Sequence, residues 1–204
     1  FYVSSQEKQS IKQNLVKNYS VLTLTPELVD PDFIKLKITT QVKYDNESTM
    51  LDEATLQDIV KKSIIDYDMN MLNDFNSYFR YSQFLAKIDQ SDESITNNLT
   101  EILMINEKPI FLDTSTSYRF RFNNALTPST LYSKAFYITG EDSAYYLDDD
   151  GLGKVRFHTM NTASEKVYNP IYSGTINYET GTVLIPDISI TSVVGTSSSI
   201  GVVV

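Results

Sequence analysis

Cysteine is absent from this sequence of 204 residues. Without thiols the chain can form neither disulfides nor thiolate metal sites, so a small disulfide-stapled secreted domain is excluded. No apolar run approaches the roughly 20 residues that span a bilayer, and the N-terminus lacks a basic segment followed by an apolar one. We therefore expect a soluble chain that does not bind membranes.

Histidine and basic residues are scarce as well. His158 is the only histidine, and neither a nucleophile-elbow pattern nor a glycine-rich phosphate loop accompanies it. Paired carboxylates such as Asp66/Asp68 have nothing that places them across a cleft. We predict no enzyme, no catalytic or cofactor-binding residue, no metal site, no cofactor and no small-molecule substrate. The 26 acidic against 17 basic residues give a net charge of −9, which disfavours nucleic acid and favours protein partners.

The clearest periodic signals lie between residues 33 and 105. Residues 33–44 alternate apolar and polar side chains, which predicts a half-buried strand. From Asp52 the period changes to about 3.6, which predicts an amphipathic helix. Its inward positions are Leu56, Ile59, Val60, Ser63, Ile64 and Tyr67. Thr49 and Asp52 have the spacing of a capping box, so the start of this helix is well specified.

Further elements complete the first half of the chain. Residues 77–95 predict a second, shorter helix with Phe84, Leu85 and Ile88 inward, and residues 99–105 predict a strand. Before the first strand we expect a short surface helix over residues 5–19 and a strand at residues 21–24. This half is predicted as an α+β unit whose helices cover one face of a small antiparallel or mixed sheet.

From residue 107 onward, turn residues recur between short apolar runs and no helix is expected. Residues 144–160 and 174–186 predict two hairpins, and the alternation in residues 118–122 places aromatic side chains inside and arginines outside. We expect residues 202–204 to dock as a strand. The second half is therefore predicted as a small all-β domain, sandwich or barrel-like. The predicted domains are residues 1–106 and 107–204, and the first residue, Phe1, suggests a fragment of a longer polypeptide.

Two binding alternatives remain open in the second half. The run from Asp148 to Asp150 fails the EF-hand spacing, yet a looser calcium site at this hairpin tip is an alternative to a tight solvated turn. Tyrosines could instead stack on sugar rings, as in a carbohydrate or host-surface binding module. The candidates are Tyr145, Tyr146, Tyr168 and Tyr172.

A family resemblance covers residues 6–105. The segments YDNESTMLDEATLQDIVKKSIIDYD and NDFNSYFRYSQFLAKIDQSDESITNNLTEILM, in this order of elements, resemble the baseplate wedge protein of T-even-like contractile-tailed phages, the product of gene six. More distantly they are similar to J-type baseplate proteins. The hairpin GTINYETGTVL is also of a type seen in the family, whereas residues 108–163 match only in their all-β character. The family offers no catalytic residue to carry over.

The resemblance implies a structural function. Copies of the family's wedge protein pair, and six wedges form a ring around the hub that rearranges when the sheath contracts. We therefore expect a homodimer that forms a higher ring in the full-length protein and binds other wedge proteins, located in the virion tail baseplate and assembled in the host cytoplasm. The residues predicted to make these contacts are Tyr78, Tyr81, Arg119 and Arg121.

Overall fold

The computed structural model describes residues 5–16, 33–74, 77–195 and 199–204. The chain divides into two compact units, Phe1–Phe33 and Ile34–Val204. The first unit contains α1 (Ser5–Ile11) followed by the π-helical turn η1 (Lys12–Val16), so the helix predicted over residues 5–19 is present in its described part. The strand predicted at residues 21–24 lies outside the described residues. Among the helices that are described, none is long and apolar enough to cross a membrane.

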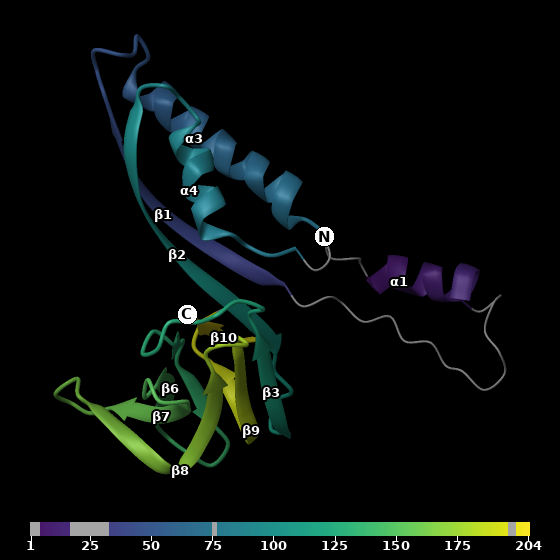
Figure 1. Cartoon of the computed structure of the whole chain (residues 1–204). Coiled ribbons are helices and arrows are strands. Elements are labelled where there is room, and N and C mark those ends of the chain that lie inside the picture. The colour runs from purple at the N-terminus through teal and green to yellow at the C-terminus, as the bar shows by residue number, and fades with distance from the viewer. Residues whose placement is uncertain (1–4, 17–32, 75–76, 196–198) are drawn as a thin grey trace. The chain divides into compact units, whose positions relative to one another are not determined.

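The second unit begins with a long hairpin covered by helices (Figure 1). Its elements are β1 (Ile34–Tyr44), α3 (Glu53–Tyr67), η2 (Asp68–Leu72), α4 (Tyr81–Asp89) and β2 (Ile95–Pro109). β1 and β2 pair antiparallel from Ile34↔Asn106 to Tyr44↔Ile95. Every second residue of β1 is half-buried and the others are exposed, as the alternation predicts.

The helices bury a small apolar cluster against the hairpin. Its buried members are Val60, Tyr67, Phe84, Ile88 and Ile95. The rings of Tyr67 and Phe84 meet edge to face with centroids 5.2 Å apart, a preferred aromatic geometry. The Ser63 hydroxyl donates to the Lys87 carbonyl, which joins the two helices at 3.1 Å. The predicted inward faces of both helices are therefore confirmed.

The start of α3 differs from the predicted capping box. Asp52 itself is the N-cap residue, because its side chain accepts a hydrogen bond from the Thr55 backbone N–H. The Thr49 hydroxyl accepts from the Leu51 N–H instead, before the helix begins. The capping-box interpretation, which makes Thr49 the N-cap residue, is therefore wrong, whereas the change of period at Asp52 correctly predicts where the helix starts. Both side chains are able to cap a helix, and the path of the backbone determines which of them does so.

The remainder of the second unit is all β within the described residues. Its strands are β3 (Ser115–Arg121), β4 (Tyr132–Ser133), β5 (Phe136–Ile138), β6 (Ala144–Asp149), β7 (Lys154–Met160), β8 (Lys166–Asn177), β9 (Thr182–Val193) and β10 (Ser199–Val203). β5 through β9 pair in chain order, and β9 returns to pair with β5. This closure makes a barrel-like domain, as predicted. Both predicted hairpins are present, as β6–β7 and β8–β9.

The barrel interior is filled by apolar side chains, the largest being Phe120, Phe122, Phe136 and Phe157. β3 pairs with β9 and turns its aromatic side chains inward, while Arg119 and Arg121 are exposed. The alternation predicted for residues 118–122 is thus confirmed.

β10 connects the barrel to the hairpin. It pairs with β2 on one side and with β4 on the other, and Val202 is fully buried. Val204 exchanges backbone hydrogen bonds with Met104 at 2.8 and 3.0 Å. The predicted docking of residues 202–204 is confirmed. The predicted domain boundary at residues 106 and 107 lies inside the continuous strand β2, and it stays a prediction.

Candidate functional site

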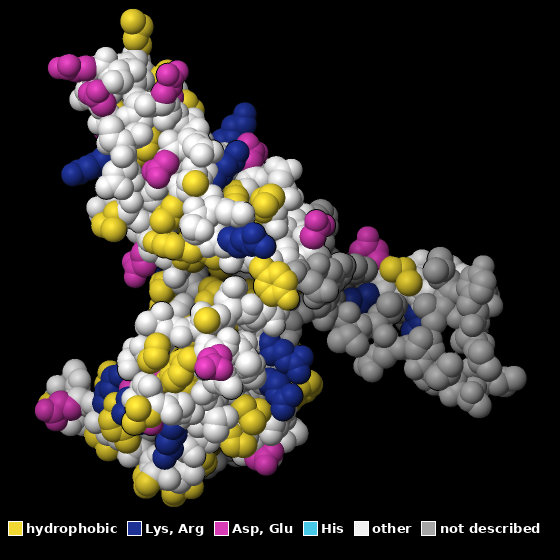
Figure 2. All heavy atoms as spheres, viewed as in Figure 1, with side chains coloured by type: hydrophobic (Ala, Val, Ile, Leu, Met, Phe, Trp, Pro, Cys, Tyr) yellow, Lys and Arg dark blue, Asp and Glu magenta, His cyan; other side chains and the backbone are white. Residues whose placement is uncertain are grey.

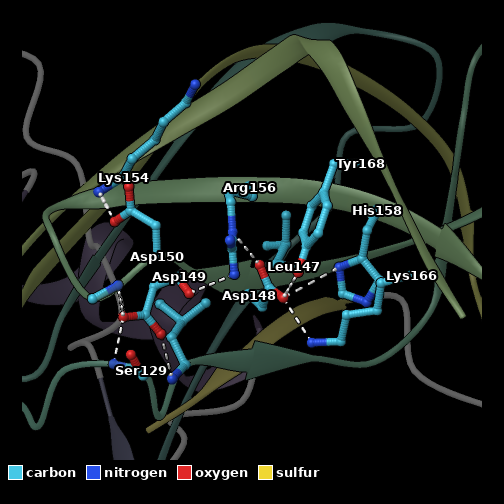
Figure 3. Close-up of polar contacts among 12 residues, drawn as sticks. Ser129, Leu147, Asp148, Asp149, Asp150, Lys154, Arg156, His158, Lys166 and Tyr168 are labelled. Carbon is cyan, nitrogen blue, oxygen red and sulfur yellow. Dashed lines mark hydrogen bonds and ion pairs between the residues drawn. The ribbon is translucent and has the colours of Figure 1, made fainter.

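Titratable side chains gather on the outer face of the barrel around Asp148 (Figure 3). The β6–β7 hairpin sets Asp148 directly opposite Arg156, and the β7–β8 pairing sets His158 opposite Tyr168. Residues directly opposite in an antiparallel pair share one face of the sheet. Lys166, two residues before Tyr168 on β8, completes the group on this face. We call these five residues the Asp148 cluster.

Asp148 is the centre of the cluster because it accepts from three side chains. Arg156 Nε donates to Oδ1 at 2.9 Å, while Lys166 Nζ and the Tyr168 hydroxyl donate to Oδ2 at 2.6 and 3.0 Å. Burial raises the pKa of a carboxyl group, but these hydrogen bonds outweigh it and hold the pKa of Asp148 below its ordinary value. The carboxylate is therefore ionised and fixes the orientation of two cations.

His158 lies beside this carboxylate without a hydrogen bond to it. Its Nδ1 is 3.8 Å from Asp148 Oδ2, is buried, and has no hydrogen-bond partner. The ring stacks on Tyr146 with centroids 5.7 Å apart. Burial lowers the pKa of His158, which Asp148 only partly opposes, and Lys166 and Arg156 lower it further. The imidazole is accordingly neutral at pH 7.

Asp149 points away from the cluster and fixes a neighbouring loop. Its carboxylate is buried and accepts from the backbone N–H groups of Ser129, Leu131 and Gly151, and from the Tyr178 hydroxyl. Burial and the hydrogen bond to Asp149 raise the pKa of Tyr178 to about 12. This carboxylate holds residues 129–131 beside β6.

Asp150 closes the hairpin turn. Its Oδ1 accepts from the backbone N–H groups of Leu152 and Lys154, and these bonds lower the pKa of Asp150. This arrangement supports the tight-turn interpretation of the Asp run. A calcium ion would have to displace those donors and the ones that Asp149 holds. The described residues contain no group of three or more His, Asp or Glu side chains close enough to hold a metal ion.

A pocket of about 470 Å³ opens above the Asp148 cluster. Residues 129–133 form one wall, and the outer face of β6, β7 and β8 forms the floor. Tyr132 pairs directly opposite Asp148 and is 47% exposed at the rim. The pocket therefore combines both signs of charge with tyrosine rings.

The sequence indicated part of this pocket. A turn at residues 150–153 places Asp148 opposite Arg156, and that opposite-charge pair could have been read from the hairpin. No sequence signal brings Lys166 to the same carboxylate, because a β-bulge shifts the β7–β8 register between Arg156 and Phe157. That partnership is visible only in the structure.

The four tyrosines proposed for sugar stacking lie in different surroundings. Tyr146 and Tyr168 line the pocket. Tyr145 is buried in the barrel core, where its hydroxyl accepts from Asn169, and Tyr172 packs edge to face on Tyr145. The structure thus brings only two of the four tyrosines together at a single pocket.

The four predicted contact residues form two pairs on different elements. Tyr78 precedes α4 and Tyr81 begins it, and these side chains are 64% and 50% exposed. The Tyr81 hydroxyl donates to the Thr100 carbonyl, which fixes the ring against β2. Arg119 and Arg121 are exposed side by side on β3. Their role in contacts stays a prediction.

Comparison with known proteins finds a similarity that includes the helix-covered hairpin. Residues 32–107 match the family model described as the baseplate structural protein gp6, C-terminal domain III. The chain is similar to the baseplate wedge protein gp6 of Enterobacteria phage T4, with 25% identity over 135 residues, which is 66% of this chain and 20% of that protein. The chain therefore spans about a fifth of this curated relative, and the resemblance predicted from residues 6–105 is confirmed.

Proposed function

We propose, from the premise that residues 32–107 form a domain of the gp6 baseplate type, that this chain is a structural subunit of a phage tail baseplate wedge. One observation carries the proposal. The residues that match the family model are almost the same as those of the β1–α3–α4–β2 unit, which has its own apolar cluster. In the full-length protein this subunit pairs with a second copy, binds other wedge proteins, and contributes to the ring that rearranges on sheath contraction. Its location is the virion tail baseplate, after assembly in the host cytoplasm.

The helical side of the hairpin supplies the surface proposed for self-association. Ile65 is exposed near the end of α3, and Met69 and Met71 are exposed in η2. Tyr78 and Tyr81 follow at the entry to α4. Exposed methionines and tyrosines are enriched at protein interfaces because they bury a large area and adapt to a partner. On the face shown in Figure 2, hydrophobic side chains are exposed among charged ones over the helix-covered hairpin.

Arg119 and Arg121 provide a second proposed contact, with other wedge subunits. β3 pairs with one strand among those described, β9, and its Arg119 and Arg121 side chains are exposed to a partner. Two exposed arginines on a chain of net charge −9 are a local basic site. Arginine binds carboxylates in a planar, two-point geometry, so an acidic surface of another subunit is the expected partner.

Sedimentation equilibrium of the chain over a wide concentration range tests the self-association. We expect a dimer that persists into the low micromolar range, which requires an interface on the order of 1,000 Å² or more. The double variant Tyr78→Ala/Tyr81→Ala should raise the dissociation constant about tenfold or more, because truncation of central tyrosines commonly costs over 1 kcal/mol in binding.

Phe111→Ala is the matched control, since Phe111 is an exposed aromatic residue outside the proposed surface. It should leave the dissociation constant unchanged. A chain that stays monomeric at about 100 µM, well above most specific dissociation constants, would contradict self-association through this part. Equal weakening by the control would contradict the choice of surface.

A further inference from the structure

We propose that the pocket between residues 129–133 and the outer face of β6, β7 and β8 binds a neutral, hydroxyl-rich ligand of the saccharide class. The inference rests on the geometry of the Asp148 cluster and is independent of the proposed baseplate function. Its volume of about 470 Å³ falls within the range of small-molecule sites, which is roughly 300–1,000 Å³.

Cross-strand pairing builds the pocket floor and the adjoining wall in two rows. One row is Tyr146, His158 and Tyr168, and the other is Tyr132, Asp148 and Arg156. The members of each row lie directly opposite one another on hydrogen-bonded strands, so backbone geometry positions their side chains. Asp149 fixes the facing wall through the N–H groups of Ser129 and Leu131. Both sides of the pocket are therefore preorganised.

The polar groups suit hydroxyls that both donate and accept. Asp148 is an acceptor, and Lys166 has three N–H donors, of which Oδ2 of Asp148 takes one. A pair of neighbouring sugar hydroxyls can donate to the carboxylate while accepting from the ammonium group. Asp148 lies between Lys166 and Arg156, so one sugar ring can reach an acceptor with a donor on either side of it.

The balance of charge disfavours an ionic ligand. Three carboxylates, those of Asp148, Asp149 and Asp150, line the pocket against the two cations Arg156 and Lys166, so opposite charges nearly balance there. The Asp149 carboxylate is already bound by backbone N–H groups and the Tyr178 hydroxyl. His158 adds no charge, because its burial favours the neutral imidazole. An anion would meet Asp148 at the centre, and a cation would meet the two basic groups. A neutral ligand encounters neither repulsion.

His158 is a second, separate observation that points to a ligand. His158 is 3% exposed and lines the pocket, and its buried Nδ1 has no partner. A buried polar atom without a hydrogen bond costs free energy. The 3.8 Å between Nδ1 and Asp148 Oδ2 exceeds hydrogen-bond distance, so the carboxylate does not satisfy this atom.

The apolar contact comes from a tyrosine at the rim. Arg156 covers one face of Tyr168, with its guanidinium carbon 4.4 Å from the ring centroid. Tyr132 is exposed at the opposite rim, and no cation or aromatic ring of the described residues stacks on it. We assign Tyr132 as the ring that packs on the apolar face of the sugar.

Ligand-observed NMR and calorimetry with the 204-residue chain test the inference. The panel contains neutral mono- and disaccharides, acidic sugars, acetate and inorganic phosphate. We expect saturable binding of at least one neutral saccharide below about 10 mM. Tyr132→Ala and Lys166→Met should each weaken that binding about tenfold, the effect of losing one hydrogen bond to a charged group or one aromatic contact.

Lys62→Met is the control for Lys166→Met, because Lys62 is exposed on α3 and outside the pocket. It should leave the affinity unchanged. Thermal unfolding of each variant shows whether the fold is kept, and Tyr132→Ala remains informative if Lys166→Met fails to fold. The inference is overturned if no neutral saccharide saturates, if acetate or phosphate binds in preference, or if both folded variants bind like the wild type. Sedimentation equilibrium, measured separately, tests the baseplate proposal.

Discussion

Asp148, Asp149 and Asp150 are consecutive in sequence but bind different groups, because successive strand residues point to opposite faces. Asp148 faces outward and holds three side chains, whereas Asp149 faces the loop at residues 129–131. Asp150 lies past the strand and accepts from turn N–H groups. The sequence alone predicted one cluster at a hairpin tip, while strand geometry separates it into three.

Replacement of Asp149 by alanine should destabilise the barrel strongly. The change removes the acceptor of three backbone N–H groups and of the Tyr178 hydroxyl in a buried site. Unsatisfied buried donors cost about 1–3 kcal/mol each, so we expect a loss of at least about 3 kcal/mol in the free energy of unfolding by urea. Asp150→Ala is the comparison and should cost less, because its partners are exposed. If both variants lose the same free energy of unfolding, water satisfies the N–H groups that Asp149 bound, and the prediction is wrong.

His158 predicts how stability changes with pH. Its folded pKa lies below the ordinary 6.5. Between 6.5 and that lower value the unfolded chain binds a proton that the folded chain does not, so stability falls as pH falls through this window. The chain should therefore take up protons on unfolding in this window. Because His158 is the only histidine, His158→Asn should abolish this uptake.

Asp148 affects stability in a separate, more acidic range of pH. Its folded pKa lies below the ordinary 3.8, so its contribution to stability is lost only as the pH falls below 3.8. Calorimetric unfolding in buffers of different ionisation enthalpy measures the proton uptake directly. A wild-type chain whose stability is flat from pH 7 to 5 would contradict a lowered pKa for His158.

At the scale of elements, patterns of period 2 and 3.6 located β1, α3, α4 and both hairpins of the barrel, because each buries one face locally. They did not reveal that β9 returns to β5, since ring closure depends on pairing between distant segments. The change of period at Asp52 marks the start of α3, but the capping-box spacing assigned the wrong N-cap residue to it. Thr49 and Asp52 are both good cap residues, and the turn at residues 45–48, in which Asp45 accepts from Glu47 and Ser48, places the second at the helix.

The cap assignment is testable with two matched variants. Asp52→Ala should lower the thermal midpoint by about 2–4 °C, because the Thr55 N–H loses its acceptor at the helix end. Thr49→Ala should change it less, since its hydroxyl accepts only from an exposed loop N–H. Circular dichroism at 222 nm during heating measures both. If Thr49→Ala lowers the thermal midpoint more than Asp52→Ala does, Thr49 is the effective cap and the capping-box prediction is right.

At the scale of the molecule, two apolar clusters share one strand. The helix-covered cluster contains Phe84 and Ile88, and the barrel cluster contains Phe120 and Ile185. β2 contributes to the first through Ile95 and pairs with β10 near its other end. Burial of apolar area stabilises each cluster separately, so a continuous strand does not by itself make them unfold together.

We therefore expect the two clusters to open separately, near the predicted boundary at residues 106 and 107. Ile88→Ala should lower the free energy of opening α3 and α4 by about 2–5 kcal/mol, because it leaves a cavity where Ile88 is fully buried. Hydrogen exchange followed by mass spectrometry should then show faster exchange in these helices and unchanged exchange in β6 to β9. Ile185→Ala, equally buried in β9, should accelerate exchange in the barrel. Uniform acceleration by Ile88→Ala would instead show that β2 couples both clusters into one cooperative unit, as a wedge that transmits force along a strand would require.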